Sequence, residues 1–255
     1  MIRFILLSNG RTGSILLQQA IGEHPGIRAF GELFHNEEQE RRRAFLELNE
    51  KFGSERAESS YYIDGEDGAE YLREGVFYQR PWKDILAVGY RMFYAHAREI
   101  PNSSTAWDYL IENKPIRVIH LTRRNLFENW LSLKIAMITK EWTRSKMSNH
   151  KRTFLPPLKM NPEQCEIYCN QVMAHREWTR KVFRNHPILE LEYEKDLCGR
   201  FKDSVKDVYD FLGLLNGPTR QLLDKQAQLK PSEQLANYYE FKQYFAHTIY
   251  ADFFE

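Results

Sequence analysis

The loop that follows the first apolar segment has the composition of an anion-binding site. It reads Ser8-Asn9-Gly10-Arg11-Thr12-Gly13-Ser14. Its glycines allow backbone N–H groups to converge, while the hydroxyl groups and the guanidinium of Arg11 supply further donors at the start of a predicted helix. The pattern G-x-x-x-x-G-K-S/T of nucleotide-triphosphate loops is absent. The loop indicates a phosphate or sulfate site, although a plain tight turn between a strand and a helix would need the same glycines.

A second group of candidate anion donors follows a buried strand pattern that ends at Thr122. The next residues are Arg123-Arg124-Asn125, and Ser132 lies two turns into the helix predicted after them. These side chains can converge on one anion at the sheet edge where open α/β sheets bind ligands. A magnesium-dependent nucleotide enzyme would typically carry an aspartate at such a strand end. The alternative is that the two arginines pair with surface carboxylates.

These hydrogen-bond donors can meet at one anion only if the strands before them end at the same edge of a sheet. The chain has the alternating strand and helix pattern of such a sheet. Apolar runs and turn residues predict strands that alternate with helices. The strands are expected at 2–7, 27–30, 85–93, 117–122 and 188–191. The helices are expected at 14–21, 37–52, 107–113, 125–139, 162–184, 200–212 and 217–226. This alternation predicts an α/β fold, a three-layer arrangement around a mostly parallel, doubly wound sheet. Segments 53–80 and 140–160 show weak patterns and are read either as lids or as surface loops.

The bulk properties narrow the class of protein. The 255 residues fit a single domain over 1–255. A formal net charge of +1 argues against a general nucleic-acid binder. The three cysteines, Cys165, Cys169 and Cys198, suit ordinary thiols in a reducing cytoplasm better than a disulfide framework or a metal site. The apolar start is too short for a signal-peptide core, and no stretch reaches the ~20 apolar residues of a membrane span.

The same blocks resemble those of the PAPS-dependent sulfotransferases, where PAPS is 3′-phosphoadenosine 5′-phosphosulfate. Arg11-Thr12-Gly13-Ser14 resembles the 5′-phosphosulfate loop, and Arg124 and Ser132 stand eight apart as in the 3′-phosphate signature. The resemblance is closest to bacterial enzymes of the nodulation-factor sulfotransferase type. Further matching blocks follow in family order: Gly31-Glu32-Leu33-Phe34, Val88-Gly89-Tyr90-Arg91, Glu192-Tyr193-Glu194 and the segment from Lys230 to Glu255. Arg91 departs from the pattern, since the family usually has lysine there.

The resemblance implies a P-loop-like phosphosulfate site, PAPS as co-substrate and adenosine 3′,5′-bisphosphate as product. No metal is implied. The acceptor would be a hydroxyl of a saccharide or of a small natural product. The implied donor-binding residues are Arg11, Thr12, Gly13, Ser14, Arg124, Ser132, Lys230 and Ser232. Arg11 would also offset charge on the leaving phosphate during transfer.

Sulfuryl transfer to a hydroxyl needs a general base. The resemblance places Glu32 in this role, because related bacterial enzymes carry a glutamate base at this point. A structural ion pair of Glu32 with Arg11 or Arg91 is the competing interpretation. His35 is the second candidate for the base, since other branches of the family use a histidine. His120 is expected to be a satisfied core histidine. His96, just past a strand, could line the acceptor cleft, but a surface position is favoured.

Three other functions stay open at this stage. One is sulfation of a non-carbohydrate secondary-metabolite alcohol specifically. Another is a non-catalytic nucleotide- or sugar-binding protein. The third is a metal-dependent nucleotide kinase or hydrolase, which the missing lysine and the arginines after Thr122 disfavour. The sequence leaves the regiochemistry and the oligomeric state undetermined.

Overall fold

The computed structural model describes residues 1–44, 66–78, 84–143, 155–221, 223 and 229–254. The chain divides into two compact units, which are described one at a time. Unit 1 consists of Met1–Thr122 and Thr179–Gln221, and unit 2 of Arg123–Trp178 and Leu222–Glu255. The single domain over 1–255 stays a prediction.

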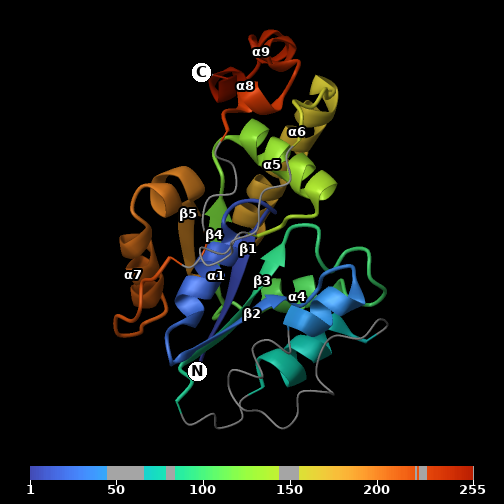
Figure 1. Cartoon of the computed structure of the whole chain (residues 1–255). Coiled ribbons are helices and arrows are strands. Elements are labelled where there is room, and N and C mark those ends of the chain that lie inside the picture. The colour runs from blue at the N-terminus through green and yellow to red at the C-terminus, as the bar shows by residue number, and fades with distance from the viewer. Residues whose placement is uncertain (45–65, 79–83, 144–154, 222, 224–228, 255) are drawn as a thin grey trace. The chain divides into compact units, whose positions relative to one another are not determined.

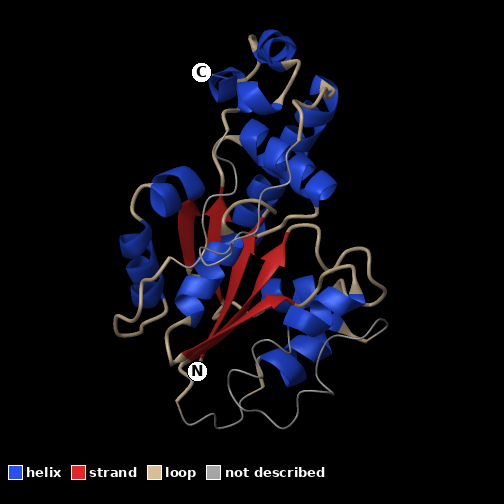
Figure 2. Ribbon diagram, in the orientation of Figure 1, coloured by secondary structure: helices blue, strands red, loops and turns tan. Residues whose placement is uncertain are grey.

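Unit 1 is built on a five-stranded sheet whose neighbouring strands are all parallel (Figures 1 and 2). The strands are β1 (Ile2–Ser8), β2 (Ile27–Glu32), β3 (Ala87–Phe93), β4 (Arg117–Thr122) and β5 (Ile188–Glu192). Their order is β2-β3-β1-β4-β5, so the direction of winding reverses at β1. The carboxyl ends of all five strands therefore meet at one edge, and the predicted α/β fold with a parallel, doubly wound sheet is confirmed.

Helices cover both faces of this sheet. On one face, α1 (Ser14–Gly22) and α7 (Phe201–Phe211) enclose a core that includes Phe4, Leu17 and Val205. On the other face, Tyr90 of β3 contacts Phe77, whose ring also stacks on Tyr109 of α4 (Thr105–Glu112). β1 and β3 are buried along most of their length, which explains their apolar runs, whereas the edge strand β5 is mostly half-buried and alternates apolar and acidic residues. The three layers expected from the sequence are present.

Unit 2 is helical. It contains α5 (Leu126–Thr139), most of α6 (Pro162–Val182), α8 (Pro231–Gln234), α9 (Tyr238–Phe245) and the 3₁₀ segment η3 (Ala251–Phe254). Half of its buried core residues are aromatic, with ring centroids of Phe127 and Phe254 at 4.4 Å and a stacked pair of Phe245 and Phe254 at 5.2 Å. Cys165 and Cys169 lie in this core as unpaired thiols, as predicted.

Some predicted elements differ from the structure. The helix predicted over 217–226 is wrong for residues 217–221, which have no helical structure. Here Gly217 packs against His24, and the carbonyl of Pro218 accepts a hydrogen bond from the hydroxyl of Tyr209. These tertiary contacts hold the segment in an irregular path. Residues 222 and 224–226 lie outside the described residues.

Other differences concern segments with weak patterns. Within 53–80, the described part forms α3 (Gly68–Glu70) and a π-helical segment η1 (Tyr71–Val76) that buries three side chains. A second π-helical segment, η2 (Tyr193–Cys198), follows β5 unexpectedly. Of the helix predicted over 37–52, residues 38–44 are helical and 45–52 lie outside the described residues. Within 140–160, the described residues 140–143 and 155–160 form no helix. Among the described residues, no helix has the length and apolarity to cross a membrane.

Candidate active site

A β-bulge at Gly31 orients Glu32. The register pairs Phe30 with Tyr90 and Glu32 with Arg91, so two steps along β2 match one step along β3. Side chains alternate between the faces of a sheet, so a regular pairing of Gly31 with Arg91 would have put Glu32 on the face of Phe30. The bulge places it on the face of Arg91 instead. A Cβ on Gly31 would lie 2.9 Å from Cβ of Ala44, so a larger residue would disturb this turn.

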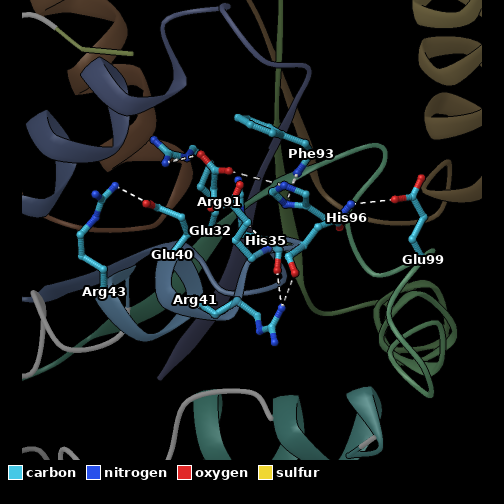
Figure 3. Close-up of polar contacts among 11 residues, drawn as sticks. Glu32, His35, Glu40, Arg41, Arg43, Arg91, Phe93, His96 and Glu99 are labelled. Carbon is cyan, nitrogen blue, oxygen red and sulfur yellow. Dashed lines mark hydrogen bonds and ion pairs between the residues drawn. The ribbon is translucent and has the colours of Figure 1, made fainter. Parts of the chain in front are cut away.

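Both carboxylate oxygens of Glu32 have partners (Figure 3). Nη2 of Arg91 donates to Oε1 at 2.6 Å, and Nε2 of His96 lies 3.5 Å from Oε2. The three side chains are nearly buried, with 16% of Glu32 and 8% of each partner exposed. The ion pair with Arg91 was one of the two roles predicted for Glu32. It leaves the other role open, because each carboxylate oxygen has a second lone pair.

The two histidines beside Glu32 present N–H groups rather than lone pairs. Nδ1 of His96 accepts a hydrogen bond from the backbone N–H of Phe93 at 3.2 Å, and Nδ1 of His35 accepts from Glu37 N–H at 3.0 Å. A neutral imidazole whose Nδ1 is an acceptor carries its proton on Nε2. In this geometry neither histidine has a lone pair available to an acceptor hydroxyl. Glu32 is therefore the stronger candidate for the base.

His96 is buried, unlike an ordinary surface histidine. Its exposed fraction is 6%, so the expected surface position is wrong. Burial, with smaller contributions from His35 and Arg91, lowers the pKa of His96 to about 3. Its ring centroid lies 6.0 Å from that of His35. This burial results from the turn that follows β3, which depends on tertiary contacts rather than on a local sequence pattern.

His120 is a core histidine, as predicted. It is fully buried in β4, with Nε2 2.7 Å from the hydroxyl of Tyr94 and Nδ1 3.0 Å from Oε2 of Glu190. Burial alone would raise the pKa of Glu190, but the hydrogen bonds and charges of His120 and Arg180 outweigh it and lower that pKa to about 2.

The loop between β1 and α1 has the geometry of an anion cradle. Arg11 and Gly13 both have left-handed backbone conformations, with φ of 63° and 81°. A Cβ on Gly13 would lie 2.9 Å from Cδ1 of Leu197 and 3.0 Å from Cδ2 of Tyr193. No side chain caps α1 and its first turn has no acidic residue, so its amino end can accept an anion. The hydroxyl of Ser8 is buried and has no hydrogen-bond partner among the described residues.

The remaining predicted site residues belong to unit 2. Arg124 is exposed and Ser132 is half-buried on α5. The neighbouring Arg123 is buried and pairs with Glu128 at 2.7 Å, so the structural role considered for the two arginines applies to Arg123.

Lys230 and Ser232 are exposed at the amino end of α8. Among the predicted site residues, the structure brings Glu32 and His35 together, and it joins Arg91 and His96 to them. Arg11, Thr12, Gly13 and Ser14 lie in the loop of the same unit. Among the described residues, no three His, Cys, Asp or Glu side chains gather as a metal site would require.

Unit 2 also contains a cavity of about 900 Å³. It lies between α5, the start of α6 and α9, and its lining includes Trp130, Lys134, Lys159, Glu240 and Tyr244. None of the predicted site residues lines it.

Comparisons with known proteins gave full-length similarities. No family model matches the chain. Nodulation protein H of Rhizobium meliloti strain 1021 is 27% identical over 266 residues, which cover 99% of this chain and 94% of that protein. Nodulation protein H of Rhizobium tropici is 25% identical over 260 residues, with 99% and 92% covered. Among solved structures, a sulfotransferase from Alicyclobacillus acidocaldarius is similar with a TM-score of 0.47 and 14% identity, over 96% of this chain and 92% of that one.

Proposed function

We propose that this chain, a homologue of nodulation protein H, uses PAPS to sulfate a hydroxyl group, with Glu32 as the general base. Its similarity to nodulation protein H along the whole chain confirms the resemblance to sulfotransferases stated above. The observation that carries the assignment of the base is the bulge at Gly31, which sets Glu32 against Arg91 at the edge where the strands end.

The loop after β1 is the proposed site for the 5′-phosphosulfate. The backbone N–H groups of Thr12, Gly13 and Ser14 and the guanidinium of Arg11 would supply the donors for an anion at the uncapped amino end of α1. The buried, unpartnered hydroxyl of Ser8 adds a further polar group next to this loop. The similarity to sulfotransferases favours PAPS over other anions.

Arg124 and Ser132 are proposed to bind the 3′-phosphate of the donor, and Lys230 and Ser232 to close over the nucleotide. Within unit 1, Ser8 at the end of β1 is the partner of Leu121 on β4, so these two strands end next to each other. The chain therefore leaves β1 toward Arg11 and leaves β4 toward Arg124 from adjacent strand ends.

The proposed reaction is an in-line transfer. The acceptor hydroxyl gives its proton to the carboxylate of Glu32 while its oxygen attacks the sulfur of PAPS. The bond between sulfur and the bridging phosphate oxygen breaks, and adenosine 3′,5′-bisphosphate leaves with the electron pair. The transition state is loose, as in phosphoryl transfer, so positioned donors such as Arg11 can offset the charge on the leaving phosphate. A saccharide is the favoured acceptor because the resembled enzymes are carbohydrate sulfotransferases.

Two measurements test this function. Adenosine 3′,5′-bisphosphate at about 100 times its dissociation constant should stabilise the protein by about 2.7 kcal/mol, and AMP at the same concentration should stabilise it less. Glu32→Gln should lower kcat by about 10²–10⁴-fold, the usual contribution of a general base, and should leave nucleotide binding intact. Equal stabilisation by the two nucleotides would contradict PAPS as donor. An unchanged kcat for E32Q would contradict the base.

A further inference from the structure

The turn after β3 holds His96 in a fixed place. The backbone N–H of Phe93 donates to Nδ1 of its ring at 3.2 Å, and the indole N–H of Trp107 donates to its backbone carbonyl at 2.8 Å. The next residue, Ala97, is buried and has a φ of 56°, a left-handed conformation that residues other than glycine adopt rarely. Such a conformation persists only when the surroundings impose it, and it is common at functional sites.

The fixed ring directs Nε2 toward Glu32. The distance from Nε2 to Oε2 is 3.5 Å, and Figure 3 shows the two side chains facing each other. Because Nδ1 is occupied by Phe93 N–H, the proton of the neutral ring lies on Nε2. The distance is long for a closed hydrogen bond, but catalytic hydrogen bonds of ligand-free enzymes commonly tighten only in the complex.

The charge of the ring matters as well as its direction. Arg91 already places one full positive charge on Oε1. A second cation beside the same carboxylate would make it a weaker proton acceptor. The low pKa of His96, about 3, keeps the ring neutral at ordinary pH, so its N–H can orient Oε2 without adding a full charge.

We propose that His96 is a positioning residue for the general base, a neutral donor from Nε2 that holds Oε2 of Glu32 while Arg91 holds Oε1. The plane of the carboxylate is then fixed, and a remaining lone pair can meet the acceptor hydroxyl. This inference rests on the proposed function, in which Glu32 takes the proton of the acceptor. It assigns His96 a role in the rate of transfer and none in binding the donor.

Two substitutions of His96 test the hydrogen bonds of Nδ1 and Nε2 separately. His96→Asn places a side-chain oxygen near the position of Nδ1, so it keeps the acceptor for Phe93 N–H and loses the donor to Glu32. His96→Gln places an amide N–H near the position of Nε2, so it keeps the donor to Glu32. We expect H96N to lower kcat about 10-fold with the KM for PAPS unchanged, and H96Q to retain kcat within about 3-fold of the wild type.

The matched control is His186→Gln. His186 is buried, with an exposed fraction of 7%. Its Nδ1 and Nε2 lie 3.0 and 3.1 Å from the carbonyls of Ile116 and Ile111. H186Q should lower Tm and leave kcat unchanged. Unaltered kcat in H96N would overturn the proposal, as would equal losses in H96N and H96Q.

A second measurement does not depend on turnover. In protein with ¹⁵N-labelled histidine, the ring of His96 should show a protonated Nε2 and an unprotonated Nδ1 from pH 5 to pH 8, and Glu32→Gln should shift the Nε2 resonance but not those of His186. A proton on Nδ1 of His96, or an Nε2 resonance that is unchanged in E32Q, would contradict the contact between His96 and Glu32. If PAPS proves not to be the donor, turnover and nucleotide binding fail together in the wild type, whereas this spectrum still decides the His96 contact.

Discussion

Arg123 and Arg124 are neighbours in sequence but have different surroundings. Arg123 is buried, pairs with Glu128, and its backbone carbonyl accepts a hydrogen bond from Arg176 at 2.6 Å. Arg124 is exposed at the start of α5. An arginine enclosed by the fold contributes to stability, and only an accessible one can meet a ligand phosphate in the usual bidentate way.

This difference predicts opposite outcomes for the two substitutions. Arg124→Ala should abolish the preference for adenosine 3′,5′-bisphosphate over AMP in thermal-shift titrations and change the Tm of the unliganded protein little. Arg123→Ala should destabilise the protein by about 1–3 kcal/mol, because it removes the packing of a buried side chain and its ion pair with Glu128, and should keep the preference. An Arg124→Ala protein that still prefers the 3′-phosphorylated nucleotide would remove Arg124 from the donor site.

Glu190 is a second residue that contributes to stability, and its contribution depends on pH. Its pKa falls from the ordinary value of 4.5 to about 2 in the folded protein, so the folded state favours the charged form. The stabilisation is present above about pH 4.5 and is lost as the pH falls toward 2. Because 41% of the side chain is exposed, solvent screening limits the contribution to about 1 kcal/mol.

Urea denaturation at several pH values checks this contribution. Glu190→Gln should be less stable than the wild type by about 1 kcal/mol at pH 7, and the difference should vanish as the pH approaches 2. A difference that persists at low pH would mean that packing rather than charge makes the contact with His120.

At the scale of elements, the connection from β1 to α1 depends on Gly13. Its φ of 81° suits glycine, and its Cα lies close to the side chains of Tyr193 and Leu197 in η2. The segment after β5 thus packs directly beneath the anion loop. The loop cannot accept a Cβ at this position without moving away from η2.

Gly13→Ala tests this dependence. A left-handed conformation costs a residue other than glycine about 1–2 kcal/mol, and the overlap with Leu197 adds to that cost. We expect a lower Tm and at least 10-fold weaker binding of adenosine 3′,5′-bisphosphate in calorimetric titration. Gly10→Ala is the control, because a Cβ there would have its nearest neighbour at 3.9 Å and should change both quantities little.

At the scale of the whole molecule, the proposed donor residues are divided between the two units. Arg11, Thr12, Gly13 and Ser14 belong to unit 1, and Arg124, Ser132, Lys230 and Ser232 to unit 2. A ligand that binds residues of both units should slow local opening in both. A ligand that binds residues of one unit should slow it there alone.

Hydrogen exchange distinguishes these outcomes. With saturating adenosine 3′,5′-bisphosphate, amides in residues 8–22 and in residues 124–139 should both exchange at least several-fold more slowly. AMP should slow the first segment and have less effect on the second, because it lacks the 3′-phosphate. Protection confined to residues 8–22 would contradict the assignment of Arg124 and Ser132.

Much of unit 1 could be predicted from local sequence, because its strands contain apolar runs bounded by turn residues and the loop after β1 is marked by glycines. The bulge at Gly31 and the burial of His96 could not, since they depend on the pairing of β2 with β3 and on the turn held by Trp107. The failed helix over 217–221 has the same origin, because contacts with His24 and Tyr209 override local preference there. The site residues named from the resemblance stay predictions.

The bulge also bears on how this protein could change over evolutionary time. A substitution of Gly31 that let this position pair with Arg91 in a regular ladder would turn Glu32 to the opposite face of the sheet, with the glutamate itself unchanged. One such substitution would then leave a chain that, on the function proposed above, could bind its donor but would lack a placed general base. Relatives that keep the glutamate but lack the preceding glycine should be assayed before they are considered enzymes.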